Sequence, residues 1–161
     1  MPGSGKSTIG KELANSLNYH FIDLDKEIEQ KEANVISEIF TTKGEHYFRR
    51  IESKLLKEIS EKKNDTVIAT GGGAPCFYNG IEFMNSLGVT IFINVNTSQL
   101  LERVKKQDER PLLKEDAEQA MINLFNSRIH IYKKAQITIN TNNLSINESV
   151  AKIKKTLKPN S

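Results

Sequence analysis

A glycine-rich hexapeptide near the start of the sequence has the composition of a phosphate-binding loop. It reads Gly3-Ser4-Gly5-Lys6-Ser7-Thr8 and leads directly into a stretch with helical periodicity. Glycines let successive backbone N–H groups curl around an anion, and the positive end of the helix dipole adds to the attraction. We expect Lys6 to reach the β- and γ-phosphates of a nucleotide and the Ser7 hydroxyl to ligate Mg²⁺. The alternative is a glycine-rich turn before an ordinary helix.

The hexapeptide is only the second half of the motif G-x-x-x-x-G-K-[ST]. The first glycine of that motif would fall one position before Met1, and no strand precedes the loop. Such a strand would contribute backbone hydrogen bonds of about 1 kcal/mol each and apolar side chains of about 1.5–3 kcal/mol each. That sum exceeds the roughly 5–15 kcal/mol by which a domain is stable. We therefore expect the natural chain to begin about ten residues earlier, which is room for one strand and its turn.

Two carboxylates follow the first apolar strand pattern at a spacing of i and i+2. They are Asp23 and Asp25, about 17 residues after Lys6. Phosphoryl transfer needs one carboxylate to support the metal and another to receive an acceptor hydroxyl, which this pair could divide between them. The plain alternative is a solvated acidic loop.

An arginine and three glycines could contact an anionic acceptor. Arg49 and Glu52 stand at i and i+3 on one predicted helix, so Glu52 can orient the guanidinium toward an anion. An ordinary surface ion pair explains that spacing equally well. Gly71-Gly72-Gly73 follows a strand pattern. Three glycines lose much entropy on ordering, so this run indicates close approach of the backbone to a ligand.

Two further arginines lie in the second half of the chain. Arg110 begins Arg-Pro-Leu-Leu in a polar segment, about residues 107–116, where a mobile lid could bring a cation to the transferring phosphate. Arg128 and Tyr132, at i and i+4, either belong to the same site or lie on an exposed helix face. The spacing leaves both alternatives open.

The elements that must position these residues alternate between helix and strand. Helices are predicted over 6–17, 26–43 (interrupted near Asn34), 45–62, 78–86, 98–106, 116–134 and 145–157, and strands over 20–25, 66–70, 89–95 and 136–140. Gly44 is predicted to be a helix C-cap. The alternation predicts one α/β domain with a parallel sheet. Ligands of such sheets lie beyond the carboxyl ends of the strands, where the two aspartates and the triple glycine fall.

Composition excludes several classes of protein. The chain has 161 residues, a net charge of +3 and no apolar run long enough to span a bilayer. Its start does not resemble a secretory signal. Cys76 is the only cysteine, which excludes an internal disulfide and suits a reducing cytoplasm. His20, His46 and His130 share no metal-ligand spacing. We expect a cytoplasmic monomer that binds small anions and neither nucleic acid nor membrane.

The motifs, taken in order, resemble those of the shikimate kinase family. The match runs from Gly3 to Ala135 and comprises Gly-Ser-Gly-Lys-Ser-Thr, Asp-x-Asp, Phe-Arg-x-x-Glu, Gly-Gly-Gly, Arg-Pro-Leu-Leu and Arg-x-x-x-Tyr-x-x-Ala. The resemblance implies a three-layer P-loop fold related to adenylate kinase, with strand order 2-3-1-4-5 and the first strand absent from this sequence. It also implies ATP- and Mg²⁺-dependent phosphorylation of the 3-hydroxyl of shikimate, on the route to chorismate and aromatic amino acids.

The resemblance also assigns roles to residues. Arg49 and Arg128 would hold the acceptor's carboxylate, Asp25 its hydroxyl, and Gly71–Gly73 would border the same pocket. Ser7 and, through water, Asp23 would hold Mg²⁺; Arg110 would reach ATP, and Arg103 would stack on adenine. One departure concerns the segment after the last strand. It reads Asn140-Thr-Asn-Asn-Leu144 where the family commonly has an arginine near adenine, so the backbone and Arg103 would have to hold the base.

Two other functions remain compatible with these motifs. Another small-molecule kinase of the same fold, such as a gluconate kinase, would use the same phosphate loop. A non-catalytic nucleotide-binding module would use it without an acceptor. For a kinase we expect direct in-line transfer, with Lys6 and Arg110 stabilising charge and Asp25 positioning the hydroxyl.

Overall fold

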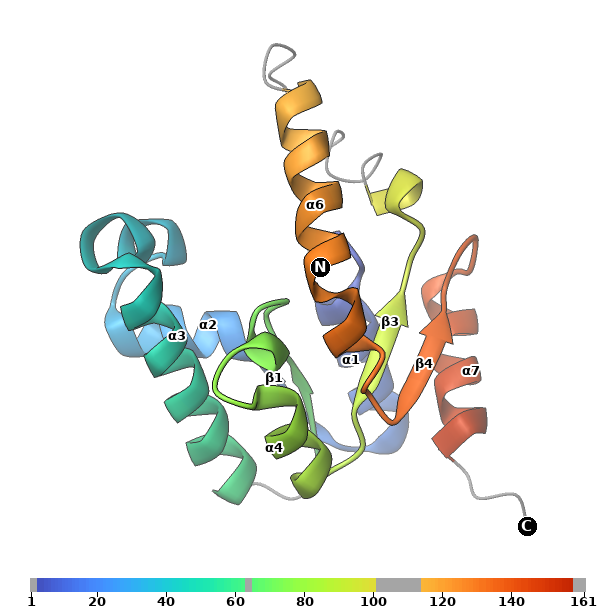
Figure 1. Cartoon of the computed structure of the whole chain (residues 1–161). Helices are drawn as coiled ribbons and strands as arrows, with labels where there is room; N and C mark the ends of the chain where they lie inside the picture. Colours follow the sequence, from blue (N-terminus) through green and yellow to red (C-terminus); the bar gives the residue numbers. More distant parts are fainter. Residues whose placement is uncertain (1–2, 63–64, 101–113, 158–161) are drawn as a thin grey trace.

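The computed structural model describes residues 3–62, 65–100 and 114–157. Its elements are α1 (Lys6–Leu17), β1 (His20–Asp23), α2 (Leu24–Glu32), α3 (Ile36–Lys62), β2 (Thr66–Ala69), the 3₁₀ turn η1 (Ala74–Cys76), α4 (Gly80–Leu87), β3 (Ile91–Asn94), α6 (Lys114–Tyr132), β4 (Ile137–Asn140) and α7 (Ile146–Leu157). Figure 1 shows them in sequence colours. Residues 97–100 are also helical. The rest of the helix predicted over 98–106 lies outside the described residues.

The strands pair as two separate parallel ribbons. β1 pairs with β2, from His20 opposite Thr66 to Asp23 opposite Ala69. β3 pairs with β4, from Ile91 opposite Ile137 to Asn94 opposite Asn140. Within the described residues no pairing joins β2 to β3. The predicted α/β fold with parallel strands is confirmed, but the sheet is divided in two at the place that the order 2-3-1-4-5 gives to the first strand.

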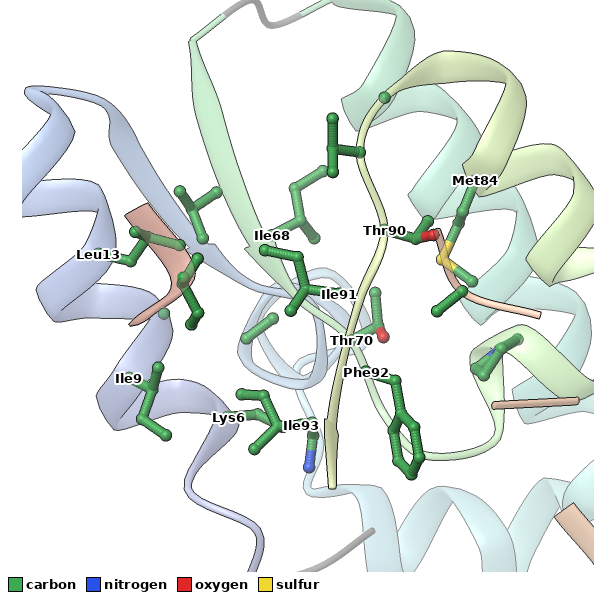
Figure 2. Close-up of a pocket in the computed structure, with 18 of the residues that line it drawn as sticks. Lys6, Ile9, Leu13, Ile68, Thr70, Met84, Thr90, Ile91, Phe92 and Ile93 are labelled. Atoms are coloured by element: carbon green, nitrogen blue, oxygen red, sulfur yellow. The ribbon is translucent and has the colours of Figure 1, made fainter. Parts of the chain in front are cut away.

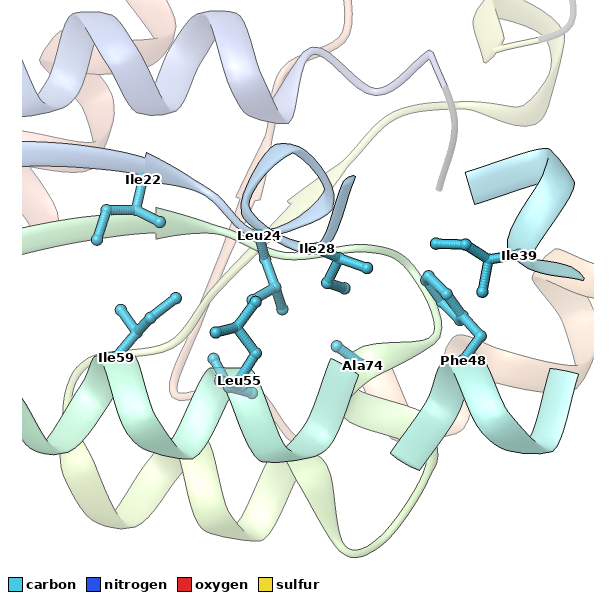
Figure 3. Close-up of a cluster of buried hydrophobic side chains, with 9 residues drawn as sticks. Ile22, Leu24, Ile28, Ile39, Phe48, Leu55, Ile59 and Ala74 are labelled. Carbon is cyan, nitrogen blue, oxygen red and sulfur yellow. The ribbon is translucent and has the colours of Figure 1, made fainter. Parts of the chain in front are cut away.

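Helices cover both faces of these ribbons. One face carries a buried cluster from α1, β4 and α7: Ile9, Leu13, Ile139, Val150 and Ile153. The other carries a cluster drawn mainly from α2 and α3, which includes Leu24, Ile28, Ile39, Phe48, Leu55 and Ile59 (Figure 3). Val67 packs on the first cluster and Ile68 on the second, since successive strand residues point to opposite faces. The three layers predicted from the resemblance are therefore present.

One predicted boundary was wrong for an identifiable reason. The strand predicted over 20–25 ends at Asp23, whose side chain accepts a hydrogen bond from the Asp25 N–H at 3.2 Å and so caps α2. Asp25 therefore lies in the first turn of a helix. Gly44, at φ 80° and ψ 166°, is not helical and separates two helical segments within α3, so the predicted helix end there is confirmed. The predicted break near Asn34 is confirmed, because Ala33 adopts a left-handed conformation after α2.

Among the described helices, none combines the length and the apolar character needed to cross a membrane.

Candidate active site

The phosphate loop wraps around the start of α1. Gly3 and Gly5 have φ values of 71° and 82°, in the left-handed region that glycine adopts readily. Gly5 immediately precedes the helix, and its carbonyl accepts a hydrogen bond from the Ile9 N–H at 2.9 Å. Ser4 is almost fully buried, at 2% exposure. Lys6 is the first residue of α1, and the exposed Thr8 lies within its first turn. The loop thus presents the amino end of a helix, as an anion site requires.

Ser7 and Asp23 meet although they are 16 residues apart. The Ser7 Oγ donates a hydrogen bond to the Asp23 Oδ2 at 2.6 Å. Hydroxyl and carboxylate oxygens are ligands that Mg²⁺ accepts, usually together with waters and phosphate oxygens. In the described parts of the chain no group of three His, Cys, Asp or Glu residues could hold a metal. The two oxygens therefore fit a Mg²⁺ ion that takes its other ligands from a nucleotide and water.

Lys6 and Asp25 interact electrostatically. Burial lowers the pKa of Lys6, and the negative charges of Asp25 and Asp23 oppose that shift. Burial also raises the pKa of Asp25, with the charge of Asp23 adding to the effect and Lys6 opposing it. A carboxylate with a raised pKa accepts protons more readily than an ordinary one, which suits a general base.

Arg49 forms a buried ion pair rather than a surface one. Its Nη1 donates to the Glu52 Oε2 at 2.8 Å, and the two side chains are 10% and 1% exposed. Its Nε reaches the Glu45 Oε1 at 3.1 Å. Burial raises the pKa of Glu52, and Arg49 counteracts the shift. The other carboxylate oxygen of Glu52 has no hydrogen-bond partner in the described structure. Glu52 thus orients the guanidinium, as the spacing suggested.

Three aromatic rings enclose the same guanidinium. The Arg49 Cζ lies 4.7 Å from the ring centroid of Phe77, 5.0 Å from that of Phe48 and 5.7 Å from that of Phe40. Such contacts favour a cation and fix the plane of the guanidinium. Sequence reasoning missed these rings, because nothing in their spacing shows that η1, which precedes Phe77, folds back onto α3.

The triple glycine passes directly over these charged groups. A Cβ on Gly71 would lie 2.8 Å from the Glu52 Oε1 and 3.1 Å from the Asp25 Oδ1. A Cβ on Gly73 would overlap the Arg49 guanidinium. Gly72 turns its carbonyl toward α6, where the Tyr132 hydroxyl donates to it at 2.7 Å. The close approach of the protein's own side chains therefore accounts for the glycines at 71 and 73. The predicted approach of this backbone to a ligand stays a prediction.

Arg128 lies on the same side of α6 as Tyr132. Its charge acts on Glu52 and Cys76 and lowers the pKa of both, although burial keeps both values raised overall. The side chain of Arg128 is half-buried. Of the two alternatives left open by the spacing, the half-buried side chain and its effect on Glu52 favour a place near Glu52 over an exposed helix face. We call Arg49, Glu52, Gly71–Gly73 and Arg128 the arginine cluster.

The remaining predicted residues concern the nucleotide side. Arg103, Arg110 and most of the predicted lid lie outside the described residues. In the segment after β4, the Asn142 side chain bonds the backbone N–H and the side chain of Asn96, at 2.8 and 3.0 Å. Asn143 accepts from Gln99. These amides tie the segment after β4 to the segment after β3.

A P-loop, an aspartate pair and an arginine cluster on an α/β scaffold define a phosphotransferase of the P-loop class. The sequence model of the family described as shikimate kinase matches residues 2–158 of this chain. The chain therefore belongs to the shikimate kinase family.

Individual relatives agree with this assignment. A shikimate kinase of Aquifex aeolicus is 46% identical over 136 residues, which are 84% of this chain and 80% of that protein. The crystal structure of a shikimate kinase from Bacteroides thetaiotaomicron has a TM-score of 0.87 and 38% identity, covering 96% of this chain and 93% of that one. A shikimate kinase from Acinetobacter baumannii, solved in complex with shikimate, has a TM-score of 0.88 and 34% identity, covering 97% and 88%.

Proposed function

We propose that this chain transfers the γ-phosphoryl group of ATP to the 3-hydroxyl of shikimate, on the route to chorismate and aromatic amino acids. The observation that carries the proposal is the close approach of Glu52 and Asp25 to Gly71 and of Arg49 to Gly73, with Asp25 also interacting electrostatically with Lys6. A relative of similar fold was solved with shikimate bound, and shikimate offers the carboxylate and hydroxyl groups that these residues would take.

On the acceptor side, Arg49 and Arg128 bind the carboxylate of shikimate. Charge-assisted hydrogen bonds from guanidinium groups suit a planar carboxylate. Glu52 and the three phenylalanine rings hold Arg49 in one orientation, so little entropy is lost when the substrate binds. Asp25 then orients the 3-hydroxyl and accepts its proton.

On the donor side, the backbone N–H groups of Gly3–Ser7 and the Lys6 ammonium bind the β- and γ-phosphates. Charge accumulates on the oxygens of the transferring group, and these donors stabilise it. Ser7 and, through water, Asp23 would hold Mg²⁺, which when bound would supply further positive charge. Arg110 completes the charge stabilisation from the lid and Arg103 stacks on adenine. Closure of the lid excludes water and so limits hydrolysis of ATP.

ADP release by the protein tests the proposal, with shikimate, gluconate or no acceptor. We expect release with shikimate alone, and loss of that release in Asp25→Asn. Glu27→Gln, a carboxylate exchange in the same helical turn, is the matched control and keeps activity. Equal release with gluconate, or with no acceptor, contradicts the assignment of the substrate. Full activity of Asp25→Asn contradicts the assignment of the base.

The remaining proposals are a cytoplasmic location and a monomeric state. The single cysteine supports the first. No nucleic-acid or membrane partner is proposed.

A further inference from the structure

A tight turn between η1 and α4 holds its two central residues in left-handed conformations. The Gly80 N–H donates to the Phe77 carbonyl at 2.9 Å, and Tyr78 and Asn79 between them have φ values of 52° and 53°. Positive φ at both positions defines a type I′ turn, in which glycine and asparagine are the usual central residues. A tyrosine in this conformation is strained, and such strain persists only where the surrounding structure holds it.

Close packing on η1 holds this turn in place. A Cβ on Gly80 would overlap the carbonyl oxygen of Ala74, so the turn closes tightly on η1. Ala74 itself belongs to the buried cluster that contains Phe48 of α3 (Figure 3). The turn is therefore held against α3 through η1.

Two consecutive side chains of the turn contact α3 one helical turn apart. The ring centroid of the half-buried Phe77 lies 4.7 Å from the Arg49 Cζ. The hydroxyl of the exposed Tyr78 lies 3.4 Å from the Nε2 of His46. The other two rings around the guanidinium belong to α3 itself. Of the three rings, Phe77 is thus the one that contacts Arg49 from outside α3.

The hydrogen bonds of Arg49 leave part of its guanidinium for an acceptor. Its Nε donates to Glu45 and its Nη1 to Glu52. Within the described residues the Nη2 donates no hydrogen bond to the protein, so its N–H groups are available to an anion. A carboxylate that accepts from Nη2 at an ordinary hydrogen-bond distance lies close to the rings that surround the guanidinium.

We propose that Phe77, packed against Arg49 from outside α3, is a specificity-determining residue of the acceptor site. The carbon that bears the acceptor's carboxylate lies beside this ring. A hydroxyl on that carbon would lose its hydrogen bonds to water there without gaining another. The ring therefore favours an acceptor that has no hydroxyl at this position, such as shikimate, over one that has it, such as gluconate. This inference rests on the proposed function, which places the acceptor's carboxylate on Arg49.

Phe77 is separate from the surroundings of the phosphate loop. An apolar cavity of about 740 Å³ lies between the two ribbons and is lined by residues such as Lys6, Thr70 and Ile91 (Figure 2). Phe77 is absent from its lining. Substitutions at Phe77 should therefore change the binding of the acceptor and leave the binding of ATP unchanged.

The test measures the dissociation constants of shikimate and quinate by calorimetry. Quinate differs from shikimate by the addition of water across the ring double bond, which puts a hydroxyl on the carbon that bears the carboxylate. We expect the wild type to bind shikimate about 10-fold more tightly or better, and Phe77→Ser to bring the ratio of the two constants close to 1.

Two further variants separate the apolar wall from a general effect of losing a ring. Phe77→Leu keeps an apolar side chain, so the preference for shikimate should stay while both dissociation constants rise a few fold, because the cation–π contact is lost. Phe83→Ser is the matched control. It removes a ring 5.4 Å from another cation, the Lys57 Nζ, and should keep both constants of the wild type.

Several results would overturn the proposal. They are equal binding of the two acceptors by the wild type, an unchanged ratio in Phe77→Ser, loss of the preference in Phe77→Leu, and the same change of ratio in Phe83→Ser. If Phe77→Ser does not fold, Phe77→Ala takes its place with the same expected fall in the ratio. Binding does not depend on turnover. Shikimate that binds with this preference but is not phosphorylated contradicts the proposed function alone, whereas a wild type that binds neither acceptor contradicts both.

Discussion

The arginine cluster and the phosphate loop are held in place by different kinds of contact. In the cluster, the buried guanidinium of Arg49 has carboxylate partners, three aromatic rings and a glycine backbone packed against it. The phosphate loop instead lies at the amino end of α1, and its residues Ser4 and Lys6 line an apolar cavity between the two ribbons. The cluster is thus fixed by short ion-pair and ring contacts around Arg49. The loop depends on the packing of apolar side chains between the two ribbons.

The largest expected effect follows from removing the cation of the cluster. Arg49→Ala leaves Glu52 buried without its partner, which costs about 3–5 kcal/mol in the free energy of unfolding. Urea denaturation measures the loss, and shikimate-dependent ADP release should disappear as well. Arg50→Ala, the neighbouring exposed arginine, is the control and should change stability by less than about 0.5 kcal/mol. A loss below 1 kcal/mol in Arg49→Ala would show that the cluster is not self-supporting.

A methyl group on Gly73 should impair the arginine cluster and leave the phosphate loop unaffected. Gly73→Ala places a Cβ on the Arg49 guanidinium and displaces it. A misplacement of this size lowers kcat/KM for shikimate about 100-fold, while the KM for ATP stays unchanged. Gly88→Ala is the control, since a Cβ there meets nothing within 4 Å. An equal rise in the KM for ATP would mean that the two regions are mechanically coupled.

The contact between α6 and the glycine backbone should have a smaller effect. Tyr132→Phe removes the hydroxyl that donates to the Gly72 carbonyl and leaves that carbonyl without this donor. The expected cost is about 1–3 kcal/mol of stability, with a rise of a few fold in the KM for shikimate and an unchanged kcat. Tyr47→Phe removes a hydroxyl of similar geometry from Glu32 and is the control. A change in kcat alone would place Tyr132 outside substrate positioning.

The smallest effect is a dependence of stability on pH. The pKa of Asp25 is raised by burial in the folded protein, so the folded state binds this proton more tightly than the unfolded state. Stability from this group is present below the ordinary value of 3.8 and is lost as the pH rises through the raised value. The difference in unfolding free energy between wild type and Asp25→Asn should therefore fall as the pH rises through that window. Urea denaturation at several pH values measures it, and a rising difference contradicts the burial of Asp25.

Local pattern was enough to predict the helices but not the contacts between them. The helix over Lys6–Leu17 has the predicted bounds, because a glycine in the left-handed conformation precedes a regular apolar stripe. The i and i+3 spacing of Arg49 and Glu52 predicted their ion pair, yet its surroundings also include Phe77 from a distant segment, which the spacing could not show. The role of Asp23 as a helix cap was missed, since the apolar strand pattern continues through Leu24. The sequence predicted that the first strand is absent. It did not predict that the other strands form two separate ribbons.

Asp23 divides its two carboxylate oxygens between two tasks. One oxygen accepts the Asp25 N–H and starts α2, and the other accepts the Ser7 hydroxyl of the loop. Asparagine keeps the first contact but presents an uncharged amide to the metal side. Serine also caps a helix but has a single oxygen, and alanine has none. Among the good helix caps only aspartate supplies both anionic oxygens. Substitutions at position 23 should therefore separate the two tasks. Asparagine should lower metal-dependent turnover more than folding, whereas alanine should impair both.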